Sequence, residues 1–127
     1  MLYVQGTAYS TGSWSSSDAS FKKNISTIGN SLDRLMKIRG TRFEFRNDEF
    51  KDYQFAKGPQ YGFIAQELEK EFPEIVKTEG DGYKSVNYNG MIPVLLEAVK
   101  EQQKQIEDQQ KQINELREAL KLINANK

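Results

Sequence analysis

The last third of the sequence carries an apolar repeat that strongly limits what this part of the chain can form. From Ile92 onward, apolar side chains recur at alternating intervals of three and four residues for about five heptads. The a positions are Ile92, Val99, Ile106, Ile113 and Leu120, and the d positions are Leu95, Gln102, Gln109, Leu116 and Ile123. A repeat of this length predicts a coiled-coil helix. A single helix docked on a small domain is the alternative, but the stretch from Lys100 to Lys127 is too polar elsewhere to be buried.

The composition of the heptad seam bears on the number of strands. The β-branched a positions, with leucine at two d positions, are compatible with a dimer. Glutamines at Gln102 and Gln109 place polar layers in the seam, and a three-fold axis can close three side-chain amides into a ring. The pattern therefore leans slightly to a trimer.

Upstream of residue 91 the periodicity changes several times and predicts a small α+β head of short helices and β-hairpins. Apolar residues spaced by three and four predict a helix that stops near Gly40: Ile25, Ile28, Leu32, Leu35 and Met36. Alternating aromatic residues on either side of a charged turn predict a first hairpin: Phe43, Phe45, Tyr53 and Phe55. The segment 61–72 predicts a short helix closed by Pro73, and a second hairpin is expected around the EGDG turn at 79–82.

These patterns divide the chain into three parts. For residues 1–16 the pattern predicts an extended or β segment followed by a serine-rich linker. We expect this segment to be the end of a preceding part of a larger protein. Residues 17–90 form the globular head, which by itself would be marginally stable. Residues 91–127 form the coiled-coil helix.

Composition excludes several classes of function. Lys+Arg and Asp+Glu both number 18, so no basic field indicates nucleic acid, and no apolar run approaches a membrane span. The sequence contains no cysteine and no histidine, which removes disulfides, histidine-based triads and most zinc sites. Any general base must be a carboxylate, a lysine or a terminal amine. No nucleotide motif or metal-ligand cluster is present, so we expect no cofactor and no metal.

Four segments in order carry a resemblance to a known family. They are S-D-x-x-x-K-x-N-I from residue 17, G-F-I-A-Q-E-L-E-x-x-F-P-E-I-V from residue 62, V-x-Y followed by P-V-L-L-E-A-V-K from residue 86, and the coiled coil. Together they resemble the self-cleaving intramolecular chaperone domain at the C-terminus of phage tailspikes, endosialidases and neck appendage proteins. The same domain occurs in some membrane-bound transcription factors that release themselves by cleavage.

The resemblance implies a function. Such a domain forms a homotrimer, holds three chains together while an upstream fibre folds, and then removes itself by autoproteolysis, which makes the folded state kinetically stable. Carried onto this sequence, the cleavage site is Ser17-Asp18, and residues 1–16 are the end of the fibre. The protein is then associated with a virion, as a tail or appendage precursor assembled in the host cytoplasm.

The resemblance also implies a Ser-Lys dyad of Ser17 and Lys22, a known variant of the serine nucleophile. Lysine must lose solvation or lie near other cations to act as a base, and copies of Lys22 on symmetry-related chains would supply this in a trimer. Ser20 stands where the family often carries an arginine, which makes Lys23 a candidate helper. Further candidate supporting residues are Asn24, Gln66 and Glu67, of which the last two could supply an oxyanion donor or simply cap a short helix.

Several alternatives remain open from the sequence. Ser17 or Asp18 could be a helix N-cap, with Lys22 solvated. Attack by Ser17 on the preceding carbonyl passes through a five-membered ring, whereas cleavage of the Ser17-Asp18 bond requires another hydroxyl or an activated water. The chain could also be a trimeric clamp that does not cleave, or a coiled-coil adaptor that docks a partner through its exposed aromatic residues.

Overall fold

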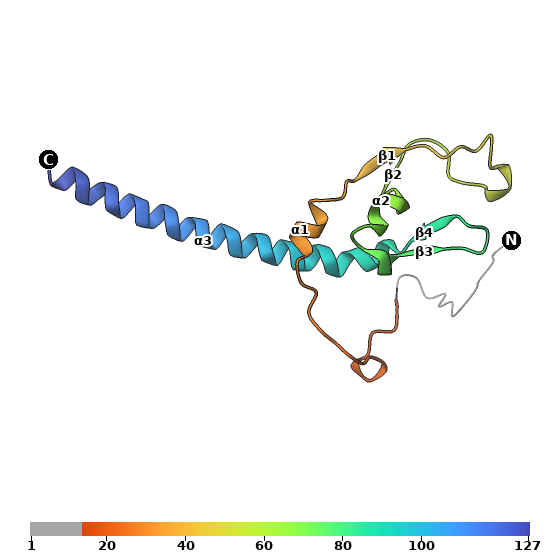
Figure 1. Ribbon diagram of the computed structural model, residues 1–127, viewed down its shortest axis with the longest axis horizontal. Helices are drawn as coiled ribbons and strands as arrows, with labels where there is room; N and C mark the ends of the chain where they lie inside the picture. Colours follow the sequence, from red (N-terminus) through yellow and green to blue (C-terminus); the bar gives the residue numbers. More distant parts are fainter. Residues whose placement is uncertain (1–13) are drawn as a thin grey trace.

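The computed structural model describes residues 14–127, and these adopt the predicted α+β fold, with short elements packed at one end of a long helix (Figure 1). The helices are α1 (Ser31–Leu35), α2 (Ala65–Glu69) and α3 (Met91–Ala125), and the strands are β1 (Thr41–Phe43), β2 (Gln60–Gly62), β3 (Val76–Thr78) and β4 (Lys84–Val86). Short 3-10 turns lie at Ala19–Phe21, Lys51–Tyr53, Pro73–Ile75 and Tyr88–Gly90. The extended segment predicted near the start of the chain lies, up to residue 13, outside the described residues.

The long C-terminal helix predicted from the heptads is confirmed. Pro93 is the third residue of α3, where a backbone N–H has no partner inside the helix in any case. Beyond its first turns α3 extends away from the other elements (Figure 1). Its heptad side chains are open to solvent, with Ile106 56% exposed and Ile113 43% exposed. An apolar stripe of this length on an isolated helix is the surface that a coiled-coil strand offers to its partners.

A small core, which we call the packed unit, forms where α2 and the β3–β4 hairpin meet the first turns of α3. The buried apolar residues are Leu68, Phe72, Val76, Met91, Val94 and Ala98. Those from α3 are spaced by three and four residues and belong to a different face from the heptad seam. The N-terminal part of α3 therefore packs on the core with one face and leaves the seam face free.

The two hairpins differ in how well the sequence predicted them. The second is confirmed, since β3 and β4 pair antiparallel with Val76 opposite Val86. For the first hairpin the predicted partner strand was wrong. The strand β1 pairs with β2, which places Phe43 opposite Gln60. Tyr53 instead ends a 3-10 turn inside the long connection between these strands. The alternating aromatic residues reflect a side-chain cluster and not two paired strands.

The predicted helix from Ile25 to Met36 is also corrected. Only α1 is helical in this region, and both Ile25 and Met36 are exposed. Asn30, just before α1, has a left-handed backbone with φ 53°, which no helix interior contains. The serine, threonine and glycine residues before Asn30 have low helix propensity, so the apolar spacing alone did not form a helix there.

A carboxylate from α3 caps the start of α1. Asn30 makes no side-chain capping bond, and Glu101 instead accepts hydrogen bonds from the backbone N–H groups of Ser31 at 3.2 Å and Leu32 at 2.7 Å. At the other end of α1, Arg34 donates to the carbonyl oxygen of Glu71 and its guanidinium lies 4.1 Å from the centre of the Phe72 ring. A helix this short has little stability of its own, so these contacts hold it in place.

Replacing Glu101 with alanine should therefore destabilise the fold by about 1–2 kcal/mol, because two partly buried backbone N–H groups lose their acceptor. The measurement is urea unfolding at one fixed protein concentration. Glu107→Ala is the matched control, since Glu107 is exposed on the same helix and, among the described residues, accepts a hydrogen bond only from Gln103 one turn away. Equal effects of the two substitutions would contradict the capping role.

Candidate functional site

The segment that contains the predicted dyad is folded into one tight turn. The carboxylate of Asp18 caps the 3-10 turn Ala19–Phe21 by accepting a hydrogen bond from the backbone N–H of Ser20 at 2.8 Å. The backbone N–H of Phe21 donates to the carbonyl oxygen of Asp18 at 3.1 Å, and that of Lys22 donates to Ala19 at 3.0 Å. Asp18 is thus an N-cap, as one of the alternatives held, but of a single turn and not of a long helix.

The same turn brings Ser17 and Lys22 together. The Nζ atom of Lys22 donates a hydrogen bond to Oγ of Ser17 at 2.6 Å. This is within the range that a base and the hydroxyl it deprotonates must reach. A lysine that holds a proton donates in this geometry, and a neutral lysine could accept the hydroxyl proton along the same line. The turn therefore has the geometry of a Ser-Lys pair.

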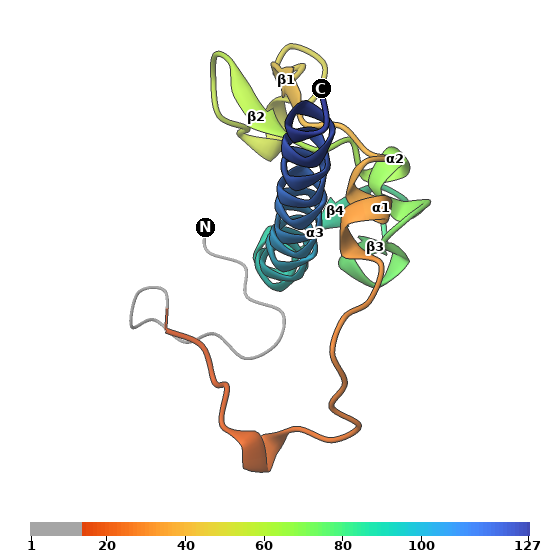
Figure 2. The same cartoon turned by 90° about the vertical axis from the view of Figure 1, so that its left-hand side faces the viewer.

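The pair lies in water in the single chain. Residues 14–27, which we call the leading segment, are exposed throughout, and Figure 2 shows them running apart from the packed unit. Among the described residues, no hydrogen bond or ion pair joins the leading segment to the packed unit. An exposed lysine is well hydrated, and among residues 14–127 no backbone N–H donates a hydrogen bond to the carbonyl of Ser17. Within the described residues, the Ser-Lys pair of one chain is therefore exposed to water.

The candidate supporting residues are not gathered at this pair. Lys23 and Asn24 follow it directly, and Asn24 bends the backbone with a left-handed φ of 54°. Glu67 lies on α2, where both of its carboxylate oxygens accept hydrogen bonds from Arg39 at 2.9 and 3.0 Å. This hydrogen bond lowers the pKa of Glu67 below its ordinary value. Gln66 lies beside it and lines a pocket on the packed unit. Within one chain, neither α2 residue contacts the dyad.

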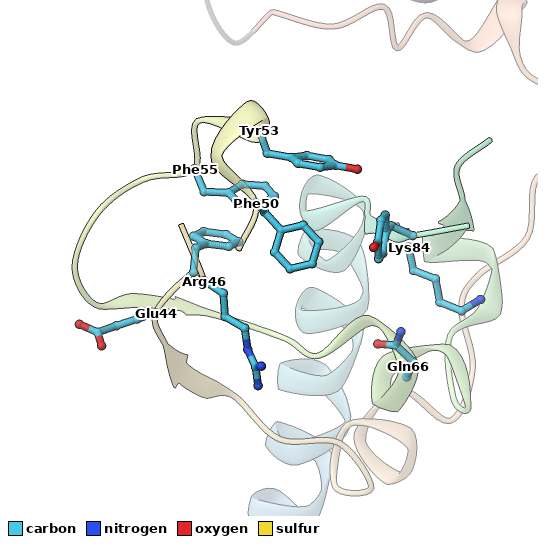
Figure 3. A pocket seen from close by; sticks show the side chains of 9 residues that line it. Glu44, Arg46, Phe50, Tyr53, Phe55, Gln66 and Lys84 are labelled. Carbon is cyan, nitrogen blue, oxygen red and sulfur yellow. The ribbon is translucent and has the colours of Figure 1, made fainter. Parts of the chain in front are cut away.

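The pocket beside Gln66 is aromatic and shallow (Figure 3). It has a volume of about 340 Å³, and its aromatic lining residues are Phe45, Phe50, Tyr53, Phe55 and Tyr83. The rings of Phe45 and Phe55 stack with centres 4.4 Å apart. The hydroxyl of Tyr53 donates to the Asp81 carboxylate at 2.9 Å, which raises the pKa of Tyr53. Three of the four aromatic residues predicted to form an exposed patch line this pocket, Phe45, Tyr53 and Phe55, together with Phe50 and Tyr83. The fourth, Phe43, does not line it.

Two structural findings concern metals and membranes. Within residues 14–127, no three histidine, cysteine, aspartate or glutamate side chains are grouped so that they could hold a metal ion. None of the helices in this part of the chain combines the length and the apolar character needed to cross a bilayer.

The geometry defines a class of protein: a small α+β unit carried on a long helix with a free apolar stripe, preceded by an exposed turn that pairs a serine with a lysine. Residues 17–77 match the model of a family described as "Chaperone of endosialidase", which carries a peptidase name, and this segment of the chain belongs to that family. The resemblance stated from the sequence motifs is thereby confirmed. The match begins at Ser17 of the turn.

Two curated proteins are similar to most of the chain. One is the long tail fiber protein Gp37 of Salmonella phage S16, 33% identical over 85% of this chain. The other is the long tail fiber protein Gp37 of Escherichia phage AR1, 31% identical over 79% of this chain. The chain spans only 15% and 10% of the lengths of these two proteins.

Proposed function

We propose that this chain is the chaperone part of a phage fibre protein, which assembles three copies, supports the folding of an upstream fibre, and then cuts itself off at Ser17-Asp18. Membership of the chaperone family and similarity to two phage long tail fibre proteins support the role in fibre assembly. The hydrogen bond between Ser17 and Lys22 is the single observation that carries the self-cleavage. The protein would accordingly be associated with a virion after assembly in the host cytoplasm.

In this proposal the three parts of the chain have separate tasks. The exposed stripe of α3, within residues 91–127, forms a three-stranded coiled coil that brings the copies together. Residues 17–90 form the head, which carries the cleavage turn. Residues 1–16 form the end of the fibre and the linker that is released from the head.

Assembly would switch the cleavage on. In one chain Lys22 is exposed, so water and not protein surrounds most of its side chain. When three leading segments are brought together, neighbouring copies exclude water from the turn and place cationic side chains near one another. Loss of water and nearby cations are the conditions under which a lysine can act as a general base. Cleavage would then begin only after the fibre chains have associated.

The attacking oxygen depends on which peptide bond is cut. Hydrolysis of the Ser17-Asp18 bond gives the carboxylate of Ser17 and the amine of Asp18, and it consumes one water molecule. Ser17 would need a four-membered ring to attack its own carbonyl, so the attacking oxygen is the Ser17 hydroxyl of a neighbouring copy. Lys22 takes the proton of that hydroxyl, Asp18 leaves as the amine, and water hydrolyses the ester that has formed. The competing route is attack by Ser17 on the carbonyl of Ser16 through a five-membered ring, which gives an ester that water hydrolyses. That route leaves Ser17 on the released domain.

One observation favours a second function, a trimeric clamp that never cuts. The Ser17-Lys22 hydrogen bond is fully exposed, and exposed polar pairs are common on protein surfaces without any chemical role. A clamp would use the same coiled coil and the same head, and its leading segment would be a simple joint.

Substitutions of Lys22 and Lys23 distinguish the self-cleaving chaperone from the clamp. We expect Lys22→Ala to abolish cleavage in the assembled chain and Lys23→Ala to slow it by no more than about tenfold, because only Lys22 reaches Ser17. The two substitutions remove the same charge from adjacent exposed positions, so they are matched. Gel electrophoresis during cell-free synthesis follows the uncut chain over time. Cleavage of the Lys22→Ala chain at the parent rate would overturn the proposed base.

A further inference from the structure

Ser20 holds the side chain of Asp18 through two hydrogen bonds. Its backbone N–H and its hydroxyl both donate to the same oxygen, Oδ1, of the Asp18 carboxylate. The two hydrogen bonds reinforce each other, because each fixes the carboxylate in the position that the other requires. The carboxylate is thereby locked over the start of the 3-10 turn.

The turn determines whether Ser17 and Lys22 can meet. In an extended chain, residues five apart in sequence are separated by ~17 Å, which is far beyond hydrogen-bond reach. In the structure the capped turn reverses the chain between them, and the side chain of Lys22 returns to Ser17 at 2.6 Å. A one-turn 3-10 segment has little stability of its own, so its cap has a large share in its population.

We propose that Ser20 is a positioning residue for self-cleavage, whose hydroxyl holds the Asp18 carboxylate as the cap of the turn that delivers Lys22 to Ser17. The inference rests on the proposed function, because it assigns Ser20 a part in that same cleavage. It explains how a chain with serine at this position can order the cleavage turn by a local hydrogen bond. Ser20 touches neither the bond that breaks nor the attacking group.

The charge state of Asp18 agrees with this role. The hydrogen bonds from Ser20 lower the pKa of Asp18 below its ordinary value, because they favour the charged carboxylate. A lowered pKa means that the cap contributes above the ordinary pKa of an aspartate and is lost as the pH falls through the lowered value. At neutral pH the carboxylate is charged and the cap is intact.

The test compares Ser20→Ala with Ser20→Thr in the full 127-residue chain during cell-free synthesis. We expect Ser20→Ala to lower the rate constant of cleavage by about five- to tenfold, the effect of losing a capping hydrogen bond. Ser20→Thr keeps the hydroxyl and should restore the rate to within about twofold of the parent. Sedimentation should show the same assembly for all three chains. A Ser20→Ala chain that cuts at the parent rate, or a threonine variant as slow as the alanine variant, would overturn the inference.

A second measurement separates this inference from the proposed function. If the parent chain does not cut itself, the uncut protein can be studied by NMR, through the nuclear Overhauser effect between the side chains of Lys22 and Ser17. That contact should weaken in Ser20→Ala and persist in Ser20→Thr. Positioning would then stand although the cleavage proposal had failed. If both variants keep the contact between Lys22 and Ser17, the positioning role of Ser20 is overturned, whether or not the chain cuts itself.

Discussion

Replacing Ser17 with alanine is expected to leave the chain uncut while it still assembles. Ser17 Oγ is the only hydroxyl to which Lys22 donates among the described residues, so its removal leaves the proposed base with no oxygen to activate inside the turn. Loss of a member of a serine-based catalytic group typically costs on the order of 10⁴-fold or more in rate. The product should fall below detection over hours in which the parent is fully converted.

The matched control for this substitution is Ser16→Ala. Ser16 is exposed, lies next to Ser17, and makes no side-chain hydrogen bond within the described part of the chain. Its removal should leave the cleavage rate within about twofold of the parent, since exposed polar side chains without partners contribute little. If Ser17→Ala cuts as fast as Ser16→Ala, the serine has no chemical role, and Lys22 would have to activate a water directly.

Breaking the heptad seam should abolish both assembly and cleavage. Ile106 and Ile113 are consecutive a positions of α3, and no other part of residues 14–127 covers them. Ile106→Asp with Ile113→Asp removes two apolar side chains, each contributing about 1.5–3 kcal/mol when fully buried, and places unpaired charges in the seam of every strand. We expect the association constant to fall by more than about a thousandfold, so that sedimentation shows single chains.

The control for the seam is Lys104→Asp with Lys111→Asp on the outer face of the same helix. Both lysines are exposed, and the double substitution changes the charge more than the seam substitution does. Assembly and cleavage should survive in this chain, because neither position faces the coiled-coil axis. Cleavage by the dissociated seam variant at the rate of the control would contradict the proposal that assembly switches the site on.

Local patterns predicted the parts of the fold that depend on neighbouring residues. The helix α3 followed from the heptads, and the β3–β4 hairpin followed from the EGDG turn between two apolar runs. The pairing of β1 with β2 was missed because a long connection separates the strands and no local signal marks the partner. The start of α1 was missed because its cap, Glu101, lies 70 residues away in sequence.

In the candidate site, too, the sequence predicted what depends on neighbouring residues and missed what depends on distant ones. The spacing of Ser17 and Lys22 was visible in the sequence, and the turn that joins them is local. The double hydrogen bond from Ser20 was not predicted, because a serine two residues after an aspartate is common in loops and the sequence does not show that both donors share one carboxylate oxygen. The separation of Gln66 and Glu67 from the turn depends on how the whole chain folds, which no motif reports.

The most direct test of the central claim is the intact mass of the chain after it has been isolated as a confirmed trimer. We expect two products, one containing residues 1–17 and the other residues 18–127, with no uncut chain remaining. A released domain that retains Ser17 would move the cut one bond upstream and support attack through the five-membered ring. A trimer that remains intact at 14.6 kDa per chain would contradict self-cleavage and identify the protein as a clamp.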